Sequence, residues 1–114
     1  IYHHFFDNVD YARTQLPTQN SVHSYFGFSF VLQNTLLDRR SEVINLFREH
    51  GIECRPIVAG NFMRNPVIER LNYTTFGTYD GANEIHDQGF FLGNDNRILE
   101  EQLTKVKELM ETLS

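Results

Sequence analysis

The sequence predicts an α/β fold of the two-layer, α+β kind, in which a small sheet of three or four strands has helices on one face. Two segments carry apolar residues at helical spacing, and three short segments are rich in aromatic and β-branched residues. These segments alternate along the chain, which is typical of a two-layer arrangement. The length of 114 residues fits one domain. The second face of such a sheet must meet water or pack on something else.

Two helices are the clearest elements. The first is expected from Asp38, as its N-cap, to Gly51, which stands at the usual terminating position. The second covers the C-terminal segment, where apolar residues line one face and charged residues occupy the rest. The apolar face consists of Leu99, Leu103, Val106, Met110 and Leu113.

Three strands are expected, at residues 25–32, 52–59 and 88–92. Turn residues dominate the stretch from Asn61 to Asn83, so we expect a long structured loop with a helical turn or two near residues 67–71. The first twenty residues form a helix or its tail and a polar linker. We therefore divide the chain into an N-terminal helical and linker segment, residues 1–20, and a domain over residues 21–114.

Charge and composition exclude several classes of function. Fifteen acidic and ten basic residues give a net charge of -5, the wrong sign for a protein that binds nucleic acid through many cations. The apolar stretches are too short to cross a bilayer, so we expect no membrane partner. Cys54 is the one cysteine, and small exported domains usually carry several. These features favour a cytoplasmic protein.

The segment from Gly51 to Pro66 concentrates the unusual residues. Arg55 stands in a predicted strand beside Pro56, which places this part of the strand at an edge or bulge and aims the guanidinium at a specific target. An equally good reading is an ion pair between Arg55 and a local carboxylate, Glu53 or Asp87. The pair Gly60 and Asn61 fits a sharp turn with positive φ angles.

The chain presents no complete catalytic constellation. The five histidines lack the spacing of a zinc site, so no metal is expected. Lys105 and Lys107 are the two lysines, and both fall on the polar side of the last helix, where a solvated charge is the usual role. Neither suits a Schiff base.

Three runs of sequence carry a resemblance to a known family. They are SYFGFSFVL at 24–32, GIECRPIVAGNFMRNPVIERL at 51–71, and ANEIHDQGFFLGN at 82–94. Together they resemble the C-terminal small domain of the DegT/DnrJ/StrS sugar aminotransferase family, whose members act on keto groups of nucleotide-linked deoxysugars. The form RPIVAGNF is closest to the nucleotide-4-keto-6-deoxyhexose 3-dehydratase branch, which removes the sugar 3-hydroxyl.

The resemblance implies a mostly antiparallel sheet and a site shared with a larger domain. It implies a pyridoxal-phosphate enzyme of deoxysugar or lipopolysaccharide biosynthesis, in which a large domain of the same polypeptide holds the cofactor and the parent is a homodimer. The present chain would close over the substrate, bind no cofactor alone and be inactive alone. The substrate is a nucleotide-linked keto-deoxysugar. Substrate-facing residues carried over by motif position are Arg55, Asn61, Phe62, Arg64, Glu53 and His86.

A reading from another class remains open at this point. The chain would then be a free-standing α/β binding or regulatory module that uses its exposed sheet face to hold a partner. In the family reading, that face and the N-terminal aromatic residues Tyr2, Phe5 and Phe6 form an apolar surface that a parent domain covers.

Overall fold

The computed structural model describes residues 2–97 and 99–114 of the chain. Three short 3-10 helices, at residues 34–36, 62–64 and 66–70, join its main elements. The helices and strands are α1 (Tyr2–Phe6), β1 (Ala12–Thr14), β2 (Gly27–Leu32), α2 (Arg40–Glu49), β3 (Cys54–Pro56), α3 (Asp80–Gln88), β4 (Gly89–Gly93) and α4 (Glu100–Leu113).

The four strands form one antiparallel sheet in the order β1-β2-β4-β3. This confirms the predicted α/β class and the small antiparallel sheet. Strand β3 lies at an edge, as the proline predicts, and Pro56 closes its ladder opposite Phe90. The strand spans only three residues, so the prediction of a strand over 52–59 was too long at both ends.

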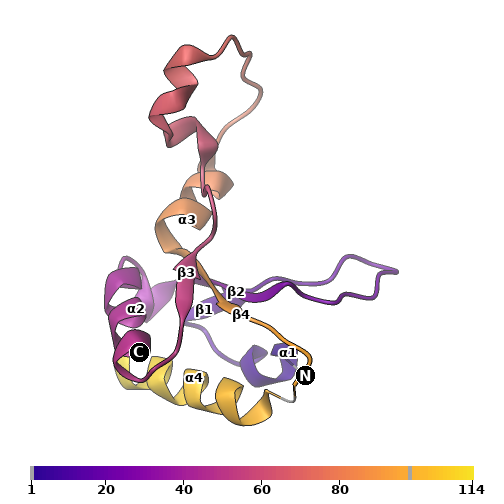
Figure 1. Cartoon of the computed structure of the whole chain (residues 1–114), viewed down its shortest axis with the longest axis vertical. Helices are drawn as coiled ribbons and strands as arrows, with labels where there is room; N and C mark the ends of the chain where they lie inside the picture. Colours follow the sequence, from indigo (N-terminus) through magenta and orange to yellow (C-terminus); the bar gives the residue numbers. More distant parts are fainter. Residues whose placement is uncertain (1, 98) are drawn as a thin grey trace.

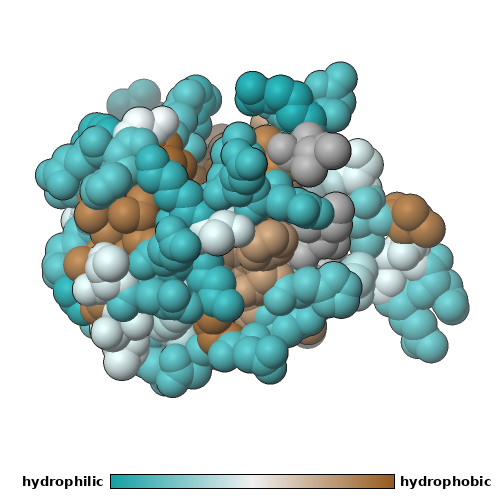
Figure 2. Space-filling view, turned by 90° about the horizontal axis from the view of Figure 1, so that it is seen from below, coloured by the Kyte–Doolittle hydropathy of each residue, from teal (hydrophilic) through white to brown (hydrophobic). Residues whose placement is uncertain are grey.

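One face of the sheet carries the core. Strand alternation sends Phe30, Leu32 and Phe90 to this side, where all three are fully buried. Helices α1, α2 and α4 cover it, and α4 contacts both α1 and α2 (Figure 1). The same side holds Val43 and Phe47 of α2 and Met110 of α4. Seen from below, polar side chains cover most of the outer surface (Figure 2), as the charged face of the last helix predicts.

The opposite face of the sheet has little cover, and we call it the open face. Alternation and register assign to it Arg13, Ser29, Val31, Phe91 and Arg55. Helix α3 lies at one end of this face, close against Gly89. A Cβ atom at Gly89 would clash with the carbonyl oxygen of Ile85, so only glycine allows this approach.

A long arm, residues 57–79, projects from the sheet beside α3 (Figure 1). Many of its apolar side chains are exposed, and the radius of gyration of 15.5 Å exceeds the ~13 Å expected of a compact domain of this length. The arm corresponds to most of the predicted loop, including its helical turns at 62–64 and 66–70. The loop prediction was wrong at its end, because α3 begins at Asp80. Gly81 and Asn83 have low helix propensity, so the local sequence does not predict this helix.

The N-terminal segment is part of the folded body. It contains the five-residue helix α1 at its start, whereas residues 12–14, within the stretch expected to be helix or linker, form β1 by pairing with distant β2. Tyr2 and Phe6 are buried in the core. The expectation that they form an exposed apolar surface was therefore wrong for these two residues.

The predicted cap of the second helix was also wrong. Arg39 is the N-cap of α2, and Asp38 lies one position earlier with a φ of 62°. The Asp38 amide donates to Oε1 of Gln88 at 2.9 Å, and the Asp38 carboxylate accepts from the Gln88 side chain. Asp38 thus ties α2 to the end of α3. The stop at Gly51 is confirmed by its φ of 72°.

Candidate functional site

Arg55 stands on the open face at the edge of the sheet. It lies opposite Phe91 in the ladder, and Phe91 lies opposite Ser29, so the three share one row. Nη2 and Nε of Arg55 donate to Oε1 of Glu53 at 2.6 and 3.1 Å. Both side chains are largely exposed. Of the two candidate partners, Glu53 therefore makes the ion pair with Arg55, and an exposed pair of this kind leaves the guanidinium within reach of a ligand.

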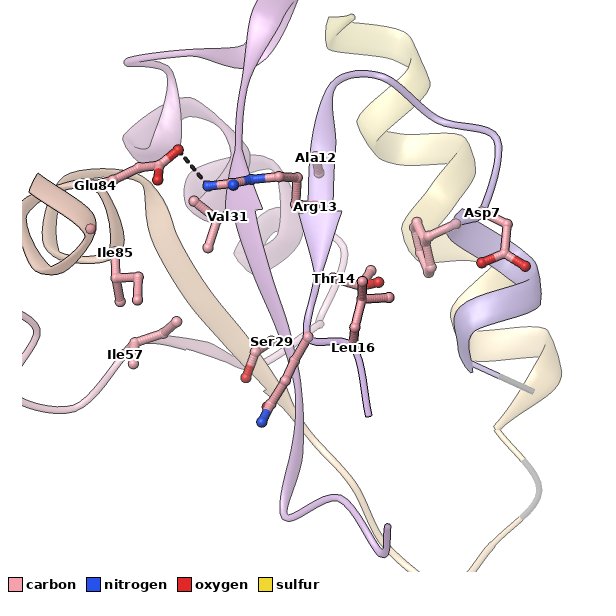
Figure 3. A pocket seen from close by; sticks show the side chains of 13 residues that line it. Asp7, Ala12, Arg13, Thr14, Leu16, Ser29, Val31, Ile57, Glu84 and Ile85 are labelled. Carbon is pink, nitrogen blue, oxygen red and sulfur yellow. Dashed lines mark ion pairs between the residues drawn. The ribbon is translucent and has the colours of Figure 1, made fainter. Parts of the chain in front are cut away.

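A cleft of about 820 Å³ lies beside β1 and β2, between α3 and the N-terminal segment (Figure 3). Ser29 and Val31 of β2 line it, with Ile57 and Ile85 on the side of the arm and α3. An ion pair of 2.5 Å between Arg13 and Glu84 spans from β1 to α3. The open face thus carries a broad apolar hollow with charged groups along its sides.

Asn61 is the buried centre of a hydrogen-bond cluster at the base of the arm. It is 4% exposed, and its backbone amide donates to Nδ1 of His86 at 3.1 Å. Its side-chain amide donates to Oδ1 of Asn83 at 2.8 Å, and its side-chain carbonyl accepts from the amide of Met63 at 3.0 Å. Asn61 therefore fixes the turn that presents Phe62, and His86 holds Asn61 from α3.

The predicted turn geometry is half right. Gly60 has a positive φ of 56°, and a Cβ atom there would lie 2.6 Å from Nδ1 of His86. Asn61 has a φ of -83°, so the expectation of a positive angle at Asn61 was wrong. The other positive angle in this turn is that of Val58, at 24°.

The remaining predicted residues lie near this cluster. Arg64 donates to Oδ1 of Asp87 at 2.7 Å, so Asp87 serves the arm and not Arg55. Phe62 begins the first 3-10 helix of the arm and is 47% exposed. The structure thus divides the six candidates between the sheet edge, with Glu53 and Arg55, and the base of the arm, with the other four.

One residue of this arrangement, Asn83, escapes the sequence reasoning, and Asp87 is considered there only as a partner of Arg55. Both residues stand on α3, three positions before and one position after His86, and they hold Asn61 and Arg64. A signal was present, because residues three and four apart share one helix face. It was hidden because the helix itself is not predicted.

Groups that could carry covalent chemistry are poorly placed for it. Burial raises the pKa of the Cys54 thiol, which keeps it protonated. Lys105 and Lys107 both lie on α4, and Lys107 pairs with Glu111 at 3.9 Å. Among residues 2–97 and 99–114, no group of acidic, histidine or cysteine side chains could hold a metal ion. In the same described part of the chain, no helix has the length and apolar character to cross a membrane.

Comparison with known proteins gives a consistent result. The model of the DegT/DnrJ/EryC1/StrS aminotransferase family matches residues 1–111. The chain is 35% identical over 112 residues to a GDP-4-keto-6-deoxy-D-mannose 3-dehydratase of Yersinia pseudotuberculosis, covering 97% of this chain and 28% of the relative. It is 32% identical over 81 residues to the lipopolysaccharide biosynthesis protein RfbH of Salmonella typhimurium, covering 69% of this chain and 18% of that protein.

A solved structure agrees with these relatives. It is the E. coli GDP-4-keto-6-deoxy-D-mannose-3-dehydratase with bound hydrated pyridoxal phosphate, similar to the chain with a TM-score of 0.85 and 32% identity. The match covers 99% of this chain and 28% of the E. coli enzyme. The chain thus spans little more than a quarter of the length of these two dehydratases. With the matched family model over nearly all its residues, the chain belongs to the DegT/DnrJ/EryC1/StrS aminotransferase family.

Proposed function

We propose that this chain is the substrate-closing part of a pyridoxal-phosphate-dependent enzyme that acts on a nucleotide-linked 4-keto-6-deoxysugar. The reaction is dehydration at C3, in deoxysugar or lipopolysaccharide biosynthesis. Support comes from the names of the relatives, two of them GDP-4-keto-6-deoxy-D-mannose 3-dehydratases and one a lipopolysaccharide biosynthesis protein.

The observation that carries the proposal is the position of Arg55. Its guanidinium stands on the open face, paired with the exposed carboxylate of Glu53, and lines a groove of about 430 Å³ at the edge of the sheet. A planar guanidinium in such a place suits a phosphate or a sugar hydroxyl. We assign to Arg55 the contact with the anionic part of the substrate, and to Phe62 the cover over the sugar.

The other candidates support these two. Asn61 and His86 act through the turn that they hold, which makes them positioning residues for Phe62. Glu53 orients Arg55, and Arg64 fastens the arm to α3 through Asp87. This division follows the burial of Asn61 and the exposure of Arg55.

The described residues do not fit pyridoxal phosphate on their own. A Schiff base needs a lysine within a phosphate-binding cradle, and both lysines lie on the surface helix α4, away from the row of Arg55 and Phe91. We infer that a large domain of the same polypeptide holds the cofactor and that the open face of the present chain packs toward it. The relatives are longer by more than threefold, which leaves room for such a domain.

Two further inferences concern the assembly and its location. A homodimer is proposed, because the arm exposes apolar side chains that this chain leaves uncovered and that a second copy could bury. A cytosolic location is proposed from the single Cys54 and from the nucleotide-sugar substrates in the relatives' names.

The direct test uses the full-length protein. Pyridoxal phosphate is expected to give its absorbance on the purified protein, and GDP-4-keto-6-deoxymannose is expected to be consumed. Mass spectrometry of the sugar product separates the two chemistries of the family, since dehydration removes the 3-hydroxyl and transamination adds an amine. A folded, cofactor-loaded protein that adds an amine instead would overturn the dehydratase assignment.

A further inference from the structure

Two phenylalanines form an aromatic platform beside Arg55. The rings of Phe26 and Phe91 have centroids 6.0 Å apart and are tilted by 44°, within the range of favourable aromatic pairs. Phe26 is 86% exposed although it is a large apolar side chain. Together with Arg55 and Arg97, the two rings line a groove of about 430 Å³. This volume is within the range of small-molecule sites.

The platform is fixed by a glycine. A Cβ atom at Gly27 would lie 2.8 Å from Cδ2 of Phe91 and 2.6 Å from the carbonyl oxygen of Leu92. Without that atom, the ring of Phe91 lies directly against the backbone of β2. Its face is thus held in place before any ligand arrives, which lowers the entropic cost of binding.

The charges around the platform favour a nucleotide over a docked apolar segment. Arg55 pairs with Glu53, and Arg97 pairs with Asp95, and all four side chains line the groove. An apolar protein segment over the groove would remove these ions from water at a high cost. A nucleoside diphosphate would instead offer a flat base to the rings and phosphate oxygens to a guanidinium.

We propose that Phe26 and Phe91 are the stacking site for the nucleobase of a nucleoside diphosphate, with Arg55 beside the diphosphate. Arg55 and Phe91 face each other across β3 and β4 on the same side of the sheet, so the base and its phosphates meet adjacent side chains. This inference rests on the proposed function, because it assigns a place to the nucleotide part of the same substrate.

The test compares GDP with inorganic pyrophosphate, which lacks the base, as ligands of the full-length protein. Phe26→Leu keeps an apolar side chain but loses the ring, and is expected to weaken GDP binding by about 5- to 150-fold, the range for one lost base–aromatic stack. Pyrophosphate binding should not change. Phe26→Trp should restore GDP binding, and Arg55→Ala should weaken both ligands.

Phe76→Leu is the matched control, since Phe76 is 98% exposed on the arm and outside the groove. It should leave both affinities unchanged. Normal GDP binding by Phe26→Leu would overturn the stacking site while leaving the proposed function intact. A lowered melting temperature with normal GDP binding would show that Phe26 instead packs on another part of the protein. If the unaltered protein binds neither GDP nor the nucleotide sugar, the proposed function falls, and the stacking site with it.

Discussion

The two faces of the sheet are built from alternate residues of the same strands, yet they differ in burial and in the helices that cover them. On β2, Phe28, Phe30 and Leu32 point into the core, while Ser29 and Val31 are only partly buried on the open face. On β4, Phe90 is fully buried and its neighbour Phe91 is not. The core face is completed by helices of this chain.

The open face has little cover from the helices of this chain, and we infer that it packs toward the large domain. It carries the groove beside Arg55, the arginines of two ion pairs and the exposed ring of Phe26. Residues that face the core are therefore expected to control folding, and residues that face the other way to control binding. Each prediction below tests that division.

The largest effect is expected from Phe30→Ala. Phe30 is fully buried, packs on Phe6 at a ring distance of 4.8 Å and stacks on Phe90 at 5.3 Å. Its loss should cost about 3–5 kcal/mol, a large share of the roughly 5–15 kcal/mol that stabilises a domain. Urea unfolding followed by circular dichroism should show the midpoint shifted to a much lower urea concentration.

The matched control is Phe91→Ala, one position along β4 and on the other face. Its ring is less completely buried than that of Phe30, so a smaller cost of about 1–2 kcal/mol is expected from the lost apolar area. Equal costs at the two positions would show that the faces do not differ as described.

The second effect is on activity. In the full-length enzyme, Arg55→Ala should remove a charge-assisted hydrogen bond worth ~1.5–3 kcal/mol and lower kcat/KM by about ten- to over a hundredfold. The melting temperature should barely change, because the ion pair with Glu53 is exposed.

Arg55→Lys sharpens this result. Lysine keeps the charge but loses the planar fork, so a partial loss of kcat/KM is expected. A purely structural ion pair would give the opposite pattern, with a lower melting temperature and normal kinetics for both variants.

The third effect is at the base of the arm. Asn61→Ala removes the acceptor for the Met63 amide and the donor to Asn83 in a buried place, at a cost of about 1–3 kcal/mol in local stability. Hydrogen exchange at the Met63 amide and proteolysis within the arm should both become faster. Asn65→Ala is the control, because Asn65 makes a similar bond to the Val67 amide at 3.0 Å but is exposed. Comparable effects of the two changes would contradict the role of Asn61 as a buried clasp.

The sequence predicts the elements whose signals are local. Helices α2 and α4 have apolar residues at helical spacing, and β2 and β4 have aromatic and β-branched residues. Both kinds of element can therefore be predicted from the local sequence pattern. Strand β1 and helix α3 have no such signal. β1 forms because Ala12 pairs with Leu32, and α3 is fixed in place by Gln88 on Asp38 and by contacts with the sheet.

The site shows the same limit. The edge position of Arg55 could be predicted, because Pro56 has few other places in a sheet. The hydrogen bonds of Asn61 to Asn83 and His86 could not be predicted. These partners stand 22 and 25 positions away, on a helix that has no local sequence signal. The platform of Phe26 and Phe91 also depends on strand register, which no local pattern supplies.

The smallest effect is expected at Tyr11, which brings a polar hydroxyl group into the core side of the sheet. Its ring is in the core, and among the residues that the structure describes its buried hydroxyl has no hydrogen-bond partner. Tyr11→Phe should therefore raise the free energy of unfolding by about 0.5–1 kcal/mol near neutral pH. A decrease would show that the hydroxyl is satisfied in solution.

The same variant should also change the response to alkali. Burial raises the pKa of Tyr11 from 10.0 to about 12. Above pH 10 the unfolded chain loses this proton first, so the free energy of unfolding falls as the pH rises towards 12. Tyr11→Phe removes this contribution and should make the loss between pH 10 and 12 shallower, although the raised pKa values of Tyr2 and Cys54 keep part of it. Identical slopes for the two proteins over that interval would show that Tyr11 is as accessible to water as the residues of the open face.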